Sequence, residues 1–396
     1  MLAKTFKGLE EVLAQELIEL GANDVLIERR AVSFMGDKAL LYRANLCLRT
    51  ASRVLVPVAT GKLKLKNDKS HIKPEDWLYE LAKGIDWSRY MTADTSFSID
   101  ATVYSDTFRN SRFVTYRVKD AVADYWMERE NKRPNVKLTE PDLFINVHIA
   151  GETVTVSLDS SGESLHKRGY RVANTEAPIN EALAAGMLLL AGWKGQSDFY
   201  DPMCGSGTLP IEAALIARNI APGLFRKSFA FEKWADFDAE LWSDIYNDDS
   251  RERDFTHKIY ASDASFYAVQ QAAKNIKSAG VQRDIELRQI RLEELKPVPL
   301  PFREGQGVGS LLMMNPPYGE RLASNRDMEL LYGKIGTALK HNWPGATAWI
   351  ISSNEAAMKS VGLKPSKKYR LLNGELDCQF NKYELFNGKR ATHLYS

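Results

Sequence analysis

The feature that most constrains the fold is an alternation of strand-like and helix-like segments that begins near residue 177. Strands that alternate with helices predict βαβ units on a parallel sheet, so the fold class expected here is α/β. Near the end, Asn373 and Gly374 separate two alternating runs and predict a closing antiparallel hairpin. We expect strands at 197–200, 258–262, 284–290, 310–314 and 347–352, and helices at 179–191, 209–220, 265–279 and 328–342.

The preceding part of the chain has a different pattern and predicts an α+β region. Apolar residues recur at helical spacing from Leu9 to Leu20, and Gly21 follows as a stop signal. Further along we expect a strand at 24–28, a helix from about 37 to 52, and strands at 143–150 and 153–158. A polar stretch rich in turn formers, 161–180, separates the two patterns and predicts a linker.

Basic and aromatic residues are interleaved in the region before the linker. The candidates for nucleic-acid contacts are Lys62, Lys64, Arg109, Arg112, Arg117 and Lys119, of which the last four alternate with Phe108, Phe113 and Tyr116. Such a run fits a solvated face whose charges pair along a helix. It equally fits a surface on which bases stack on rings and phosphates bind Arg and Lys. The net charge of +2 excludes a polybasic protein but not a local RNA-binding patch.

Cysteine usage and hydrophobicity indicate the compartment. The three cysteines are far apart, form no CxxC pair, and predict neither a disulfide framework nor a zinc site. The N-terminus lacks the apolar core of a signal peptide. The most apolar stretch, 182–193, is shorter than the ~20 residues that a membrane-spanning helix needs. We therefore expect a cytoplasmic protein without a bound metal or a membrane partner.

The sequence DPMCGSGT, residues 201–208, follows a predicted strand and opens a helix. Gly205 and Gly207 permit a tight turn and let a ligand approach the backbone. No lysine follows as in a phosphate-binding P-loop, and Pro210 stands where a dinucleotide fingerprint has its third glycine. The turn therefore predicts a ligand other than a nucleoside triphosphate or a nicotinamide dinucleotide.

Two carboxylates narrow the choice of ligand. Asp201 directly precedes the turn, where it would repel a diphosphate but suits a cation. Asp263 ends the next strand, where it is placed to accept ribose hydroxyls. S-adenosylmethionine has a sulfonium cation, an amino group and a ribose, so it fits both acids better than NAD does. Each acid alone could instead cap a helix.

A second element follows the strand-like run SLLMM. In NPPYGERL, residues 315–322, two prolines cannot continue a central strand, so Asn315 is expected at the carboxyl edge of the sheet. The side-chain oxygen of Asn315 and the carbonyl of Pro316 can accept both N–H bonds of an exocyclic amine, and Tyr318 can stack on a flat base. In isolation, this element could be an ordinary Asn-Pro turn.

Together, DPMCGSGT, SDAS and NPPYGERL resemble motifs I, II and IV of amino-methylating class I methyltransferases. The fuller resemblance, over nearly the whole chain, is to the RlmL-like 23S rRNA guanine-N2 methyltransferases that carry a THUMP domain. The segments that resemble this family are FKGLEEVLAQELIELGA, RANLCLRTASRVL, SGESLHKRGYR, APINEALAAGMLLLAGW and PGLFRKSFAFEKWADF.

The resemblance implies a ferredoxin-like region at 1–54, an RNA-binding THUMP domain at 55–160, the linker at 161–180 and a Rossmann-like methyltransferase domain at 181–396. It implies that 23S rRNA or a large-subunit precursor is the partner. It also implies two sets of site residues. The set for S-adenosylmethionine is Asp201, Gly205, Gly207 and Asp263, and the set for a flipped guanine is Asn315, Pro316 and Tyr318.

One position departs from the family pattern. Arg291 stands where the family has an aspartate for the adenine amine, so a backbone contact, Glu293 or Glu294 would have to replace that acid. Some family members carry a second methyltransferase half, and we expect one activity here. Adenine-N6 or protein-glutamine methylation fits the same motif, and an inactive RNA-binding assembly factor is a further alternative.

Overall fold

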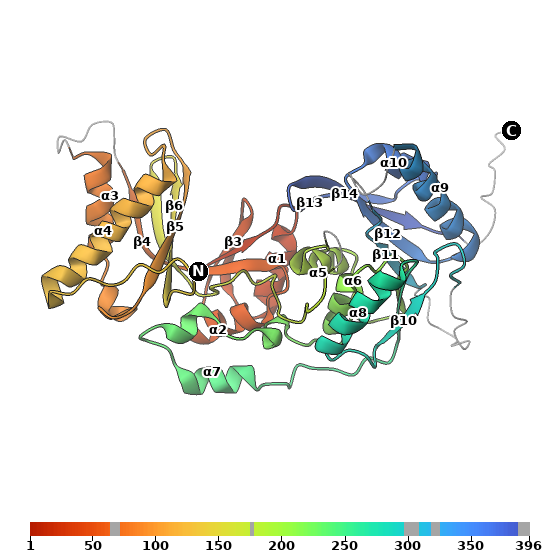
Figure 1. Ribbon diagram of the computed structural model, residues 1–396, viewed down its shortest axis with the longest axis horizontal. Helices are drawn as coiled ribbons and strands as arrows, with labels where there is room; N and C mark the ends of the chain where they lie inside the picture. The colour runs from red at the N-terminus through yellow and green to blue at the C-terminus, as the bar shows by residue number, and fades with distance from the viewer. Residues whose placement is uncertain (64–71, 175–177, 297–308, 318–324, 387–396) are drawn as a thin grey trace. The chain divides into compact units, whose positions relative to one another are not determined.

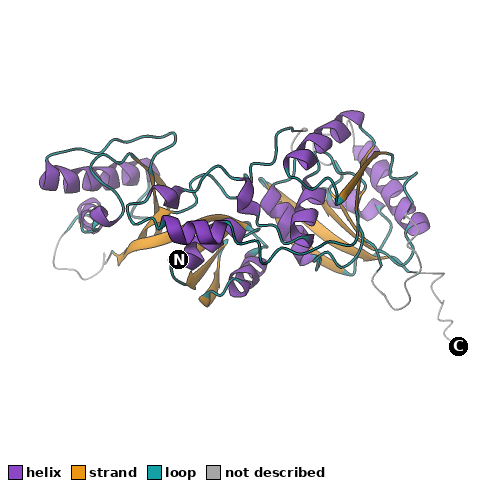
Figure 2. Ribbon diagram, turned by 90° about the horizontal axis from the view of Figure 1, so that it is seen from below, coloured by secondary structure: helices purple, strands orange, loops and turns teal. Residues whose placement is uncertain are grey.

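The computed structural model describes residues 1–63, 72–174, 178–296, 309–317 and 325–386 (Figures 1 and 2). Its residue contacts divide the chain into two units, each with a seven-stranded sheet. The N-terminal unit comprises Met1–Thr5, Ala14–Leu165 and Arg226–Asn247. The C-terminal unit comprises Phe6–Leu13, His166–Phe225 and Asp248–Ser396.

The sheet of the N-terminal unit is mixed, in the order β2-β3-β1-β4-β7-β6-β5. Only β5 and β6 pair in parallel among its named strands. The strands are β1 Leu2–Thr5, β2 Asn23–Glu28, β3 Ala31–Met35, β4 Ala51–Lys62, β5 Phe97–Tyr104, β6 Leu143–Ala150 and β7 Thr153–Asp159. The α-helices with residues in this unit are α1 Glu10–Glu19, α2 Lys38–Cys47, α3 Pro74–Lys83, α4 Ser111–Glu130 and α7 Ala239–Tyr246.

The expected helix over 37–52 is wrong at its C-terminal end. The N-cap is Asp37, whose side chain accepts a hydrogen bond from the Leu40 amide at 2.8 Å, as helix starts require. Helix α2 ends at Cys47 because the half-buried carboxylate of Glu16 accepts the backbone amides of Arg49, at 2.7 Å, and Thr50, at 3.1 Å. Those amides therefore leave the helical pattern, and β4 begins at Ala51.

The sheet of the C-terminal unit is the expected α/β sheet. Its order is β10-β9-β8-β11-β12-β14-β13, with parallel pairing from β10 to β12 and an antiparallel pair at the end. The strands are β8 Phe199–Asp201, β9 Ile259–Asp263, β10 Ile285–Gln289, β11 Leu311–Met314, β12 Thr347–Ser352, β13 Lys367–Asn373 and β14 Leu376–Glu384. The strand order reverses between β8 and β11, where open α/β sheets bind ligands at the carboxyl ends.

The closing hairpin is confirmed, but its loop is shifted by one residue. Asn373 pairs with Leu376, so the two loop residues are Gly374 and Glu375. Gly374 has φ +63°, a conformation that glycine adopts without strain. The glycine therefore takes the first loop position, and Asn373 remains the last residue of β13.

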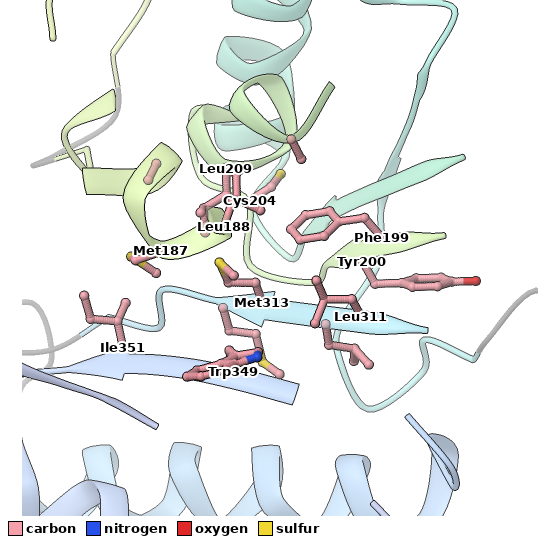
Figure 3. Packing of buried hydrophobic residues seen from close by; sticks show 14 of the residues in the cluster. Met187, Leu188, Phe199, Tyr200, Cys204, Leu209, Leu311, Met313, Trp349 and Ile351 are labelled. Atoms are coloured by element: carbon pink, nitrogen blue, oxygen red, sulfur yellow. The ribbon is translucent and has the colours of Figure 1, made fainter. Parts of the chain in front are cut away.

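Helices cover both faces of this parallel sheet, with α5, α6 and α8 on one face and α9 and α10 on the other (Figure 1). Side chains of α5 and α6 pack on those of β8 and β11 (Figure 3). Every residue of α6 is buried, so this helix has no polar face. The helices are α5 Glu181–Leu190, α6 Thr208–Ala217, α8 Phe266–Ser278, α9 Asn325–Asn342 and α10 Glu355–Ser360.

Each unit also contains one segment that lies far in sequence from the rest of that unit. Leu9 is fully buried in the core of the C-terminal unit, where a Cβ on Gly186 of α5 would lie 2.6 Å from its methyl groups. Residues 226–247 pack in the N-terminal unit, where Phe231 stacks on Tyr42 with ring centroids 4.4 Å apart. The edge of Trp242 meets the same tyrosine ring. Leu9, Tyr42 and Phe231 are buried and Trp242 is half-buried, so these contacts contribute to the stability of each unit.

Candidate functional site

The glycine-rich turn connects β8 to α6 at the carboxyl edge of the parallel sheet. Gly205 and Gly207 have φ values of +54° and +86°, which residues other than glycine rarely adopt. A Cβ on Gly207 would also lie 3.2 Å from that of Ala272 on α8. The Cys204 amide donates to the carbonyl of Ser262 at 2.9 Å, which fixes the turn against the end of β9. The turn therefore has the conformation and the position that its sequence predicts.

Asp201 presents a buried acceptor at the start of this turn. Its side chain is 1% exposed, and its Oδ1 accepts the Met203 amide at 3.1 Å. Its Oδ2 is buried without a hydrogen-bond partner in the described part of the chain. Burial, and then the nearby charge of Asp263, raise the pKa of Asp201 well above its usual range. An uncompensated buried carboxylate is unfavourable, so this oxygen is suited to a cationic or hydrogen-bond-donating ligand.

Asp263 bridges two adjacent loops. One carboxylate oxygen accepts the Gly205 amide at 3.0 Å and the other accepts the Ser265 amide at 2.9 Å. The second bond is a local turn contact that precedes α8, and the N-cap of that helix is Ser265, whose hydroxyl accepts the Ala268 amide. The first ties β9 to the glycine-rich turn. Each carboxylate oxygen retains a further acceptor site, so these bonds leave capacity for ribose hydroxyls.

The structure brings Asn315 to the same edge of the sheet. It follows β11, whose Leu311 and Leu312 pair with Phe199 and Tyr200 of β8. The Asn315 Oδ1 is buried, and no donor reaches it among the residues that the structure describes. Pro316 is buried next to it, whereas Tyr318 lies outside the described residues. The site therefore combines two buried acceptors, on Asp201 and Asn315, at the ends of neighbouring strands.

Other groups near the turn are less suited to chemistry. Burial raises the pKa of the Cys204 thiol well above its usual range, so this cysteine is a packed residue and not a nucleophile. Arg291 is exposed after β10, where its carbonyl accepts the Glu294 amide at 3.0 Å. The Glu293 carboxylate lies 3.7 Å from the ammonium of Lys334 on α9. The replacement of the family aspartate by a backbone contact, Glu293 or Glu294 stays a prediction.

In the N-terminal unit, the basic candidates on α4 divide into two groups. Arg112 and Lys119 each lie 5.7 Å from the centroid of the Tyr116 ring, and Tyr116 is 49% exposed. The spacing of these three residues places them on one face of the helix. We call this set the α4 face.

Arg117 belongs to the second group and points elsewhere. It donates to Asp76 at 2.7 Å and to the Glu75 carbonyl at 3.0 Å, and it covers the ring of Tyr79. Its guanidinium thus holds α4 to α3.

The remaining basic candidates have simpler surroundings. Arg109 donates to the Asp106 carbonyl at 3.2 Å, just before α4. Lys62 is exposed at the end of β4, and Lys64 lies outside the described residues. Arg109 and Lys62 can therefore add to a basic surface, but their contacts define no built site.

Sequence reasoning assigned no role to two residues that contact the glycine-rich turn. Arg171 donates to Ser206 and Thr208, and the buried Asn275 on α8 donates to the Ser206 carbonyl. The sequence could have indicated a role for Asn275, because this polar residue occupies the buried face of an amphipathic helix and must find hydrogen-bond partners there. Arg171 gave no signal because it lies in a segment read as a polar linker.

None of the helices in the described part of the chain combines the length and the apolarity needed to cross a bilayer. Within that same part, His, Cys, Asp and Glu side chains form no group able to hold a metal ion.

Comparison with known proteins places the three regions of the chain in known families. The model of the RMKL-like methyltransferase domain, UPF0020, matches residues 168–382. The THUMP domain model matches residues 73–159, and the RlmL ferredoxin-like domain model matches residues 1–55.

Individual relatives extend over the full chain. A candidate RNA methyltransferase of Synechocystis sp. is 39% identical over 97% of this chain and 96% of its own length. The ribosomal RNA large subunit methyltransferase K/L of Syntrophotalea carbinolica is 37% identical over 96% of this chain. That match covers 52% of the relative, so the chain spans about half of its length. A methyltransferase solved in complex with SAH superimposes with a TM-score of 0.83, at 29% identity and 98% coverage of both chains.

Proposed function

The chain belongs to the RMKL-like methyltransferase family, and on that premise we propose that it methylates the exocyclic N2 of a guanine in 23S rRNA with S-adenosylmethionine as the methyl donor. The THUMP match and the names of the relatives support an RNA substrate, free or in a large-subunit precursor. The relative solved with SAH supports the donor.

The residues around the glycine-rich turn fit this donor. When bound, S-adenosylmethionine supplies an electrophilic methyl group on a sulfonium cation. The unpartnered Oδ2 of Asp201 accepts from the positively charged part of the ligand and compensates its charge. Gly205 and Gly207 leave the backbone open to close approach. Asp263 uses its remaining acceptor sites for ribose hydroxyls.

The proposal that an exocyclic amine accepts the methyl group rests on the buried amide oxygen of Asn315, which has no hydrogen-bond donor among the described residues. The lone pair of an exocyclic amine is delocalised into the base, so the amine is a poor nucleophile until it becomes pyramidal. Asn315 Oδ1 and the Pro316 carbonyl accept its two N–H bonds, orient the lone pair and stabilise the positive charge that develops on nitrogen. The proton is then lost readily, so a strong general base is not required. Tyr318 stacks on the flipped base.

The α4 face contributes to RNA binding through phosphate contacts and base stacking. Arg109 and Lys62 supply further positive charge in the same unit, and Lys64 stays a predicted RNA contact. Arg117 contributes less, since Asp76 neutralises its charge and its donors are engaged.

The decisive experiment transfers labelled methyl groups from S-adenosylmethionine to 23S rRNA from a strain that lacks this gene, followed by nucleoside analysis. Label in N2-methylguanosine is the expected result. Label in N6-methyladenosine, or in protein, would replace guanine by one of the alternative acceptors. Cofactor binding without transfer to RNA or precursor particles would reject this substrate, and no cofactor binding would favour an inactive RNA-binding protein.

A further inference from the structure

Residues 171–173 of the C-terminal unit are hydrogen-bonded to the glycine-rich turn at several points. Arg171 donates through Nη1 to Ser206 Oγ at 3.1 Å and through Nη2 to Thr208 Oγ1 at 2.9 Å. Its Nε donates to Glu181 at 2.7 Å, and its side chain is only 14% exposed. One guanidinium thus connects the turn to the first residue of α5.

Asn275 holds the same turn from its other side. Its Oδ1 accepts the amides of Val172 and Ala173, both at 2.9 Å. Its Nδ2 donates to the carbonyls of Ala173, at 2.8 Å, and Ser206, at 2.9 Å. The side chain is 1% exposed and uses both of its acceptor sites and both of its donors. Ser206 is therefore held at its hydroxyl by Arg171 and at its carbonyl by Asn275.

The hydrogen bonds from Arg171 and Asn275 to Ser206 matter because of where Ser206 lies in the turn. It lies between Gly205 and Gly207, the two residues whose missing side chains make the turn conformationally permissive. A permissive turn loses conformational entropy when a ligand orders it, and this loss weakens binding. Bonds that fix Ser206 beforehand remove part of that loss.

We propose that Arg171 and Asn275 are positioning residues that preorganise the glycine-rich turn for S-adenosylmethionine. The inference rests on the proposed function for the identity of the ligand. It assigns the expected linker a role in cofactor affinity. Arg171 requires its planar fork of donors, because a lysine ammonium is a point charge that cannot reproduce the same set of bonds to Ser206, Thr208 and Glu181.

The test compares R171K with R218K in the full chain. Arg218 lies at the opposite end of α6, where it pairs with Glu252 and Asp284 at 3.9 and 3.8 Å. For R171K we expect the Kd for S-adenosylmethionine, measured by calorimetry, to rise about tenfold, the factor for one lost charge-assisted hydrogen bond. The KM for the donor should rise in parallel, kcat at saturating donor should stay within about twofold, and the melting temperature of the ligand-free protein should stay within about 2 °C. R218K should leave the Kd unchanged.

Thr208→Val tests the same hydrogen bond from its other partner. It removes the hydroxyl that accepts from Arg171 and leaves the ion pair between Arg171 and Glu181 intact. Each single variant should weaken binding, and the double variant should weaken it by less than the product of the two effects. An unchanged Kd in both single variants, an equal loss in R218K, or a loss confined to kcat would overturn the inference. Failure of the wild-type protein to bind S-adenosylmethionine would instead overturn the proposed function.

Discussion

The two seven-stranded sheets differ in where they offer polar groups to a ligand. In the N-terminal unit the candidate groups lie on the α4 face, where Arg112 and Tyr116 are exposed and Lys119 is half-buried and paired with Asp120. In the C-terminal unit they are buried acceptors at the carboxyl ends of β8 and β11, on Asp201 and Asn315. Exposed charges act weakly and additively, whereas a desolvated acceptor without a partner has a large effect. Variants in the two regions should therefore differ in size and kind.

The largest effect is expected for Asn315→Ala. Removal of the buried amide oxygen should lower kcat by about 10²–10³-fold, the range for one preorganised electrostatic group in a desolvated site. The Kd for S-adenosylmethionine should stay within about twofold of wild type. Asn342→Ala, at the end of α9, is the matched control and should retain activity. Full turnover in the Asn315 variant would contradict the amine-acceptor role.

A packing test compares Leu9, which directly precedes α1, with Ile18 within that helix. Leu9→Ala should lower the free energy of unfolding by about 2–5 kcal/mol, because the buried leucine fills space beside Gly186. Ile18→Ala should change it by less than about 0.5 kcal/mol, since Ile18 is 54% exposed. Urea denaturation followed by tryptophan fluorescence measures both. Equal losses would show that burial does not separate the two positions.

On the α4 face, Tyr116→Ala should weaken binding of the 23S rRNA substrate by about tenfold, within the range for one stacked base. Arg112→Ala should reduce the salt dependence of RNA binding by about one unit of slope in a plot of log Kd against log salt concentration.

Arg117→Met should lower the stability of the protein and leave its RNA affinity nearly unchanged, because Arg117 binds Asp76 and the Glu75 carbonyl. If the Arg117 variant lost more RNA affinity than the Tyr116 variant, the division of α4 into two groups would be wrong.

The last expected effect, which involves one proton and no lost side chain, is a pH dependence of cofactor affinity. Burial raises the pKa of Asp201 in the ligand-free protein, and a bound cation favours the carboxylate, so binding releases a proton. Affinity for S-adenosylmethionine should therefore rise with pH, by up to about tenfold per unit below that raised pKa, and level off above it. Calorimetry in buffers of different ionisation enthalpy detects the released proton. Asp201→Asn should remove the dependence, and a persistent slope would assign it to another group.

Local patterns were sufficient for much of the fold. The alternation after residue 177 predicted the parallel sheet, and the prolines after Met314 predicted that Asn315 lies at its carboxyl edge. One error arose where a distant group competed with a local preference, because Glu16 accepts two backbone amides and α2 ends early. The other error was local, since the hairpin loop begins at Gly374, where glycine adopts the positive φ without strain.

The amino-acid sequence predicts which chemical groups are available and on which elements they lie: a glycine-rich turn flanked by acids, an Asn-Pro-Pro element after a strand, and a basic aromatic helix. How each group is used depends on the packing of the folded chain. In the folded chain, one side-chain oxygen each of Asp201 and Asn315 is buried without a hydrogen-bond partner among the described residues. Arg117 is paired with Asp76. Arg171 and Asn275 are hydrogen-bonded to the glycine-rich turn. These outcomes depend on partners that are distant in sequence. Burial and hydrogen bonding are set by non-local packing, which no periodicity encodes.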